Sequence, residues 1–192
     1  MNFTIARIAG LAVSSVFIGP DKMPDPWKDP GFNKILFVEG PHRDARPKDM
    51  VVDTVVVHAT VSPTLEGTTK WFMNPESKVS AHYTIGKDGS IMQHVSTFER
   101  AWHAGKSVDK EGREGVNSFS IGIELVNLND GKDPYTRPQV EALYNIIAVM
   151  KRRFPIKYIT SHEYIAVPKG RKSDPKGFPW AALDPLGLEI VR

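Results

Sequence analysis

The 192-residue sequence contains no cysteine. Disulfides, thiolate zinc ligands and thiol nucleophiles are therefore excluded. The absence of cysteine is compatible with both an oxidising and a reducing compartment. The sequence also lacks a run of about 18 apolar residues, the length that a spanning helix needs, so we expect no stable membrane span. The formal net charge is only +3, with an isoelectric point near 9.0. That excess suits adhesion to an anionic cell wall but is too small to indicate a nucleic-acid partner.

The composition is typical of a soluble globular protein, with 41% hydrophobic and 24% charged residues. A chain of this length fits one domain with an appendage and can fold without a metal or a disulfide. We expect an N-terminal extension at 1–49 and one folded domain at 50–192. The extension starts with an apolar stretch at 8–18, which is either an ordered element of the domain or a secretion signal. Six prolines between residues 20 and 48 then predict an extended arm.

Strands alternate with helices through the predicted domain. The β-branched run that ends in His58 predicts a strand buried on both faces, and Asp88-Gly89 is a strong hairpin signal. Thr136 followed by Gln139 resembles a capping box at the start of an amphipathic helix. The alternation predicts an α/β fold, a single domain with a central mixed β-sheet flanked by helices. The expected elements are a strand at 51–57, a helix at 62–72, a hairpin at 83–95, a strand at 119–126, a helix at 137–153 and a strand at 156–161.

Three side chains are candidate zinc ligands: His58 and His162, which close predicted strands, and Asp174 in the loop that follows. Ligands at strand ends lie on a rigid frame and can face an open cleft. Two imidazoles and a carboxylate leave a fourth position for water, whose pKa zinc lowers to about 7. A lone strand-terminal histidine is more often structural, however, and HExxH is absent because Ala166 stands where its second histidine would be.

Glu124 and Lys172 are the candidate catalytic residues. Glu124 interrupts an apolar strand, where a carboxylate is costly to bury without a partner. It is either paired with a lysine or arginine at the sheet surface or a general base beside a metal. Lys172, two residues before Asp174, could stabilise an oxyanion or could simply be a solvated loop charge.

Several stretches, read together, resemble the type 2 family of N-acetylmuramoyl-L-alanine amidases. This family includes phage endolysins, muropeptide-recycling amidases and peptidoglycan recognition proteins. The resemblance implies that His58, His162 and Asp174 hold Zn²⁺. The matching stretches, in the family's order, are 55–60, 71–75, 79–83, 86–89, 101–105, 117–124, 170–175 and 178–180.

The same resemblance assigns roles around the implied zinc site. Glu124 and Lys172 match the catalytic positions of recycling-type members, whereas Ala81 stands where phage lysozyme-type members use a tyrosine. The spacing from His162 to Asp174 is longer than usual in the family, which predicts a loop bulge at 163–169. The expected contacts with the glycan or stem peptide are His82, Trp102, His103 and Asn117. For His82, packing in the protein core is an equal alternative.

The resemblance implies an enzyme that hydrolyses the amide bond between N-acetylmuramic acid and L-alanine in peptidoglycan. We expect peptidoglycan as its partner and a monomer as its state. We expect intact cell wall as the substrate and a wall-directed protein, because the N-terminal arm and the basic isoelectric point suit a lytic or secreted enzyme. The alternative is cytoplasmic recycling of anhydro-muropeptides, which the Glu124 and Lys172 pattern suits. A non-catalytic peptidoglycan-binding module is a third interpretation, disfavoured because all three ligand positions are filled.

Overall fold

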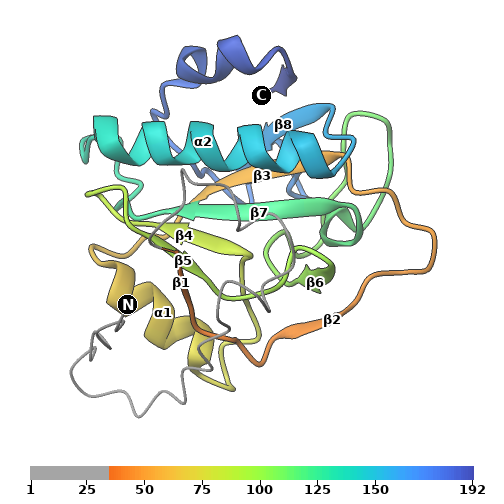
Figure 1. Cartoon of the computed structure of the whole chain (residues 1–192), viewed down its shortest axis with the longest axis horizontal. Coiled ribbons are helices and arrows are strands. Elements are labelled where there is room, and N and C mark those ends of the chain that lie inside the picture. Colours follow the sequence, from red (N-terminus) through yellow and green to blue (C-terminus); the bar gives the residue numbers. More distant parts are fainter. Residues whose placement is uncertain (1–34) are drawn as a thin grey trace, which may run out of the picture.

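The computed structural model describes residues 35–192, so the predictions for the apolar start at 8–18 and for the arm up to residue 34 lie outside the described residues. A seven-stranded mixed sheet in the order β1-β5-β4-β7-β3-β8-β9 forms the centre of the molecule (Figure 1). This confirms the predicted α/β class. The strands are β1 (Ile35–Phe37), β3 (Thr54–Ala59), β4 (Tyr83–Ile85), β5 (Ile91–Gln93), β7 (Ser120–Leu125), β8 (Tyr158–Ser161) and β9 (Glu189–Val191).

Parallel pairing dominates the middle of the sheet. β3 pairs with β7 on one side and β8 on the other, and both pairs are parallel. The predicted hairpin is confirmed, since β4 and β5 are antiparallel partners. Gly89 in its turn has φ +82°, and a Cβ there would lie 2.8 Å from the Pro138 carbonyl oxygen, so only glycine fits.

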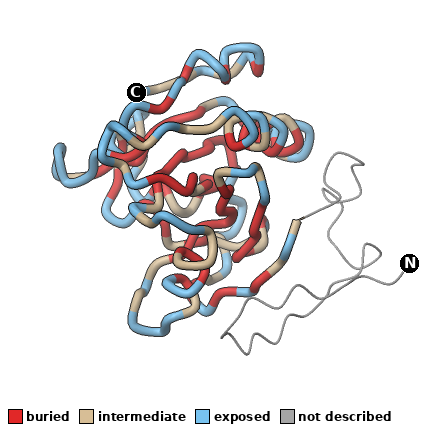
Figure 2. The backbone as a smooth tube through the Cα atoms, turned by 90° about the vertical axis from the view of Figure 1, so that its left-hand side faces the viewer, coloured by how far each residue is buried: buried red, intermediate tan, exposed pale blue. Residues whose placement is uncertain are grey.

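The two faces of the sheet bury different partners. Val55 and Val57 of β3 belong to the main apolar core, which also contains Leu143 and Ile147 of helix α2 (Arg137–Arg153). In Figure 1, α2 runs across the sheet along β3 and β7. Val56 lies on the opposite face in a smaller cluster with Phe119 and Ile165. Figure 2 shows the buried residues as red segments in the interior of the molecule.

Helix α2 begins as predicted but only half of the expected capping box forms. The Thr136 side chain accepts a hydrogen bond from the Gln139 backbone N–H. The Gln139 side chain, in contrast, donates to the carbonyl oxygens of Ile85 and Val126 at 2.9 and 3.1 Å. It therefore ties the start of α2 to β4 and to the end of β7.

Residues before position 50 contribute to the folded unit. β1 pairs in parallel with β5 at the sheet edge, and β2 (Arg43–Ala45) pairs antiparallel with β6 (Glu99–Ala101). The proline-rich segment predicted as an extended arm thus supplies two short strands after residue 34. Within residues 35–192, the other helical elements are α1 (Leu65–Met73), α3 (His162–Ile165), and the short helices η2 (Val116–Ser118) and η3 (Trp180–Leu186).

Local signals misplaced one helix start. Thr64, not Ser62, caps α1, and its side chain accepts from the Gly67 backbone N–H at 3.0 Å.

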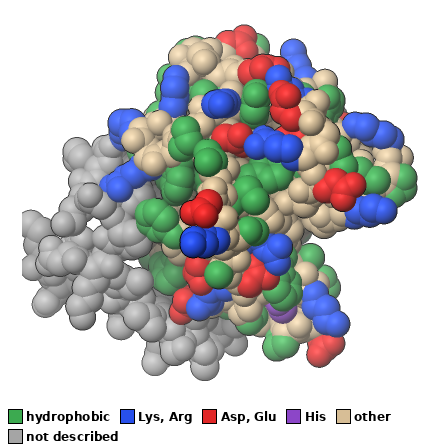
Figure 3. Space-filling view, turned by 90° about the vertical axis from the view of Figure 1, so that its right-hand side faces the viewer, with side chains coloured by type: hydrophobic (Ala, Val, Ile, Leu, Met, Phe, Trp, Pro, Cys, Tyr) green, Lys and Arg blue, Asp and Glu red, His purple; other side chains and the backbone are tan. Residues whose placement is uncertain are grey.

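Across residues 35–192, no helix combines the length and apolarity needed to cross a bilayer. On the face seen in Figure 3, the acidic and basic side chains are interspersed rather than gathered by sign.

Candidate metal centre and active site

The three predicted ligands meet at one edge of the sheet. His58 lies near the end of β3, and His162 directly follows the parallel neighbour β8, so both side chains leave the same edge. Asp174 reaches them from the loop after α3. Its Oδ2 lies 3.1 Å from His162 Nδ1 and 3.4 Å from His58 Nδ1. One ligand atom from each residue lies within 4.8 Å of the others, and all three residues are buried.

The charge states of this triad suit a cation. Burial, with the nearby His162, lowers the pKa of His58 to about 4, with Asp174 acting in the opposite direction. Burial alone would raise the pKa of Asp174, but its contacts with His162 and His58 hold that pKa well below its usual value. A neutral imidazole and an ionised carboxylate are the forms that bind metal. His58 Nδ1, moreover, is a buried polar atom without a hydrogen-bond partner within the described structure, as expected of a metal ligand.

The loop that carries Asp174 is fastened at two points. The Glu163 backbone N–H donates to the Asp174 carbonyl oxygen at 2.9 Å. The Arg171 guanidinium donates to the carbonyl oxygens of Ala104 and Lys106 at 3.1 and 2.8 Å. The long spacing between His162 and Asp174 thus accommodates α3 and a turn anchored to the neighbouring loop.

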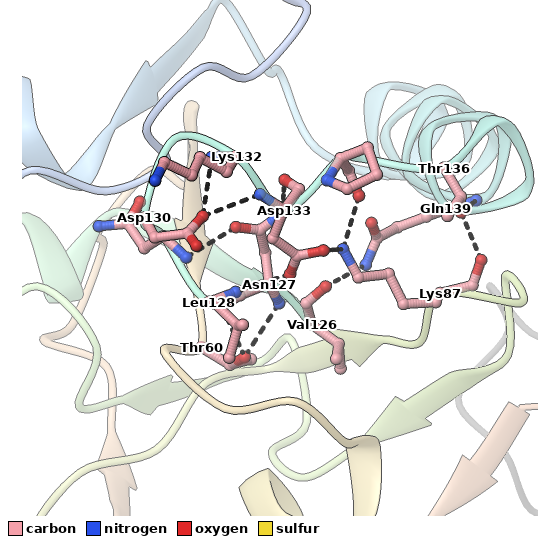
Figure 4. Close-up of polar contacts among 12 residues, drawn as sticks. Thr60, Lys87, Val126, Asn127, Leu128, Asp130, Lys132, Asp133, Thr136 and Gln139 are labelled. Atoms are coloured by element: carbon pink, nitrogen blue, oxygen red, sulfur yellow. Dashed lines mark hydrogen bonds and ion pairs between the residues drawn. The ribbon is translucent and has the colours of Figure 1, made fainter.

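A second loop, at 127–133, supports the same segment from the other side. Asp133 accepts hydrogen bonds from the Leu128 backbone N–H and from Lys87 Nζ, both at 2.8 Å, which Figure 4 shows as the centre of a polar network. Asn129 in this loop accepts from the Lys176 backbone N–H at 2.7 Å, and its amide donates to the Ser173 hydroxyl at 3.2 Å. The position of Asp174 is therefore fixed by contacts far away in the sequence.

A cavity of about 530 Å³ borders two members of the triad. Glu124 and Lys172 both line it, together with His162 and Asp174. Glu124 Oε2 is buried and has no hydrogen-bond partner within the described structure. Burial, reinforced by Asp174, raises the pKa of Glu124 to about 8, and the charge of Lys172 opposes this shift. The carboxyl group is thus unpaired and faces the metal site, as a general base would be.

The four expected substrate contacts divide into two groups. Trp102 and His103 line the cavity. His82 is fully buried, and its Nε2 lies 3.1 Å from both the Arg46 guanidinium and the Glu99 carbonyl oxygen. The structure therefore does not bring His82 to the cavity wall.

Asn117 has a supporting position behind the cavity. Its Oδ1 accepts hydrogen bonds from the backbone N–H groups of His103 and Ala104 at 3.1 and 2.8 Å. The side chain shapes the loop that presents His103, and Asn117 is not among the residues that line the cavity.

Sequence reasoning missed other residues of the site. Trp71 and Val61 line the cavity and are 53% and 68% exposed, so they present apolar surface at its rim. Trp71 belongs to the stretch at 71–75 that carries the family resemblance, which was the available signal. Arg46 lies outside all of the stretches that carry the family resemblance, so no sequence motif identified it. Its guanidinium donates to the carbonyl oxygens of Thr97 and Ser120 at 3.2 and 2.8 Å.

A family model described as N-acetylmuramoyl-L-alanine amidase matches residues 48–177. The chain belongs to this amidase family. The match includes every candidate metal ligand and both candidate catalytic residues. The enzyme is therefore an N-acetylmuramoyl-L-alanine amidase with a buried candidate metal site of two histidines and an aspartate.

Individual relatives agree with this assignment. The amidase is 37% identical over 166 residues to the 1,6-anhydro-N-acetylmuramyl-L-alanine amidase AmpD of Enterobacter cloacae, covering 75% of this chain and 85% of the relative. It is similar to a crystal structure of an AmpD selenomethionine derivative with a TM-score of 0.67 and 31% identity, covering 85% of this chain and 98% of the other.

A third similar protein was solved with a ligand. This is the N-acetylmuramyl-L-alanine amidase AmiD of E. coli in complex with the substrate anhydro-N-acetylmuramic acid-L-Ala-D-γ-Glu-L-Lys. The TM-score is 0.65 at 28% identity, and the alignment covers 75% of this chain and 61% of the AmiD chain.

Proposed function

We propose that this amidase is a zinc enzyme whose substrates are soluble anhydro-muropeptides. The observation that supports this chemistry is the convergence of His58, His162 and Asp174 next to a cavity. Glu124 lines the same cavity, and its Oε2 has no hydrogen-bond partner within the described structure. The enzyme would hydrolyse the amide bond that joins the lactyl group of anhydro-N-acetylmuramic acid to L-alanine.

The donor set favours zinc over harder cations. Two imidazole nitrogens and one carboxylate oxygen match three-ligand catalytic zinc sites, whereas Mg²⁺ and Ca²⁺ prefer oxygen ligands throughout. When bound, zinc supplies positive charge that polarises the substrate carbonyl, lowers the pKa of water to about 7 and favours ionised Glu124.

Glu124 and Lys172 have complementary tasks in the proposed reaction. Glu124 accepts a proton from the water that attacks the lactyl carbonyl carbon. Its carboxyl group then delivers a proton to the L-alanine nitrogen as the C–N bond breaks, so that the peptide leaves with a free amine. The Lys172 ammonium group, on the cavity wall, stabilises the negative charge that develops on the carbonyl oxygen.

The choice of substrate departs from the expectation that intact wall is attacked. Support for the soluble substrate comes from the relatives: the AmpD enzyme of Enterobacter cloacae is named for 1,6-anhydro-N-acetylmuramyl-L-alanine and aligns over 85% of its length. The AmiD structure holds an anhydro-muramoyl tripeptide as substrate. Basic charge and proline content, which favoured the wall, are weak signals beside alignments of that length.

Turnover on two substrates tests this proposal. The full chain is incubated with anhydro-N-acetylmuramoyl-L-Ala-D-γ-Glu-L-Lys and, separately, with purified sacculi, and new amino termini are quantified. We expect faster release from the soluble compound, loss of activity with a chelator, and recovery on adding Zn²⁺. Faster release of amino termini from sacculi would support intact cell wall as the substrate. Activity that survives complete metal removal would exclude the zinc mechanism.

A further inference from the structure

A chain of hydrogen bonds runs behind His58, on the side away from Asp174. The Ser120 hydroxyl lies 2.7 Å from the Val116 carbonyl oxygen and 3.1 Å from His103 Nε2. His103 Nδ1 in turn lies 3.0 Å from His58 Nε2. All of these side chains are buried. The chain thus connects a backbone carbonyl to a candidate metal ligand through two side chains.

The backbone carbonyl fixes the direction of every bond in this chain. A carbonyl oxygen only accepts, so the single hydroxyl hydrogen of Ser120 points to Val116. The Ser120 oxygen must then accept from His103 Nε2–H. A neutral imidazole carries one N–H, so His103 Nδ1 is an acceptor and His58 Nε2 must donate to it. The remaining nitrogen, His58 Nδ1, is left with a free lone pair.

The surroundings of His103 favour its neutral form. Its ring packs against those of His58 and His82, with centroids 5.1 and 5.8 Å away. His82 Nε2 also lies 3.1 Å from the Arg46 guanidinium. A second proton on His103 would bury another positive charge in this group of rings beside an arginine.

The free lone pair coincides with the atom that faces the metal site. His58 Nδ1 is the nitrogen 3.4 Å from Asp174 Oδ2, and it has no hydrogen-bond partner within the described structure. The His162 ring, in contrast, lies between two acceptors: its Nδ1 is 3.1 Å from Asp174 Oδ2 and its Nε2 is 3.3 Å from the Ala104 carbonyl oxygen. The assignment of an unprotonated Nδ1 therefore applies to His58 alone.

We propose that Ser120 and His103 are positioning residues that hold His58 in the Nε2–H tautomer and thereby set the metal affinity of the site. The inference rests on the proposed zinc function. This role for His103 differs from the expected substrate contact, because its two ring nitrogens are hydrogen-bonded to Ser120 and His58. Partners of this kind typically contribute about 10- to 100-fold in metal affinity.

Nitrogen-15 NMR of the metal-free full chain tests the tautomer directly. We expect His58 to carry its proton on Nε2 in the wild type. In Ser120→Ala, His103 loses its acceptor and can place its proton on Nδ1, so His58 should shift towards Nδ1–H. A wild-type His58 that is protonated on Nδ1 would overturn the proposal.

Zinc competition titrations on the same proteins test the consequence. Ser120→Ala and His103→Leu should bind zinc about 10- to 100-fold more weakly than wild type. His103→Asn should retain most of the affinity, because its amide oxygen can accept from His58 Nε2 near the position of the lost Nδ1. Equal affinity in wild type, Ser120→Ala and His103→Leu would refute the proposed role.

Ser107→Ala is the matched control for Ser120→Ala. Ser107 is also a buried serine, and its hydroxyl contacts only backbone groups, the Gly105 carbonyl oxygen and the Val116 N–H. It should lose stability without a change in the His58 tautomer or in zinc affinity. A similar loss of affinity in Ser107→Ala would show that loosening of the loop, and not the tautomer, is responsible.

The two measurements separate this inference from the zinc function itself. If the wild type binds no zinc, the proposed function fails, while the NMR result still decides whether the chain fixes the tautomer. If zinc binds and His58 is already protonated on Nδ1 before binding, the zinc function stands and the positioning role is refuted.

Discussion

His58 and Glu124 are register partners on the neighbouring parallel strands β3 and β7. Side chains at paired positions leave the same face of a sheet, so the candidate metal ligand and the candidate base are placed side by side by strand register alone. The residues one position earlier, Val57 and Ile123, point to the opposite face and enter the core with α2. A one-residue slip would send Glu124 into that apolar core.

Replacing Glu124 with glutamine should reduce turnover by about 10²- to 10⁴-fold, the usual contribution of a general acid–base group. Zinc content should stay near the wild-type value, because the proposed ligands are untouched. The thermal midpoint should not fall, since the change removes a buried carboxyl group that has an unpaired oxygen. Parallel measurements of kcat, bound zinc and Tm check this. Near-normal kcat would exclude Glu124 as the base.

Lys172→Ala should lower kcat by about 10²- to 10³-fold if its ammonium group stabilises the oxyanion. The loss should be in kcat more than in KM, because the charge acts on the transition state. Lys169→Ala is the matched control: Lys169 is exposed in the same loop, bonds the Tyr164 carbonyl oxygen and does not line the cavity. A similar loss in both variants would point to loop disorder instead.

Gly122→Ala should weaken zinc binding although Gly122 touches no ligand. A Cβ at this position would lie 2.6 and 2.7 Å from Cδ2 and Nδ1 of His103, so the ring must move away from its partners. Overpacking of this kind typically costs about 1–3 kcal/mol of stability. Gly40→Ala is a suitable control, because its nearest contact is the flexible end of Met73 at 3.2 Å. Zinc titration and thermal unfolding of both variants provide the comparison.

Acidification should destabilise the protein partly through His94, which lies outside the metal site. Burial lowers its pKa in the folded state from 6.5 to about 3. Below about pH 6.5, His94 therefore binds a proton in the unfolded chain but stays neutral in the folded chain. The free energy of unfolding consequently decreases as the pH falls towards 3. His94→Gln should show a smaller loss between pH 7 and pH 4 in urea titrations of the metal-free protein. Equal pH slopes would show that His94 does not contribute.

The sequence determined the features that depend on neighbouring residues. The β-branched run before His58, the Asp88-Gly89 turn and the periodicity after Thr136 each specify their element through local steric and hydrogen-bonding preferences. The ligand and base candidates could also be found, because a histidine or carboxylate at the end or in the middle of an apolar strand is costly to bury unless it is paired or binds a ligand.

Tertiary structure decided what depends on contacts between distant segments. The pairing of β1 with β5 and of β2 with β6 brings residues before position 50 into the fold, which no local pattern in that proline-rich segment indicates. The side of the sheet that each histidine faces also follows from packing, so His82 lies behind the cavity while His103 lines it. The choice of nitrogen with which His58 faces the metal site depends on a carbonyl 58 positions away, at Val116, since hydrogen-bond direction passes through space and not along the chain.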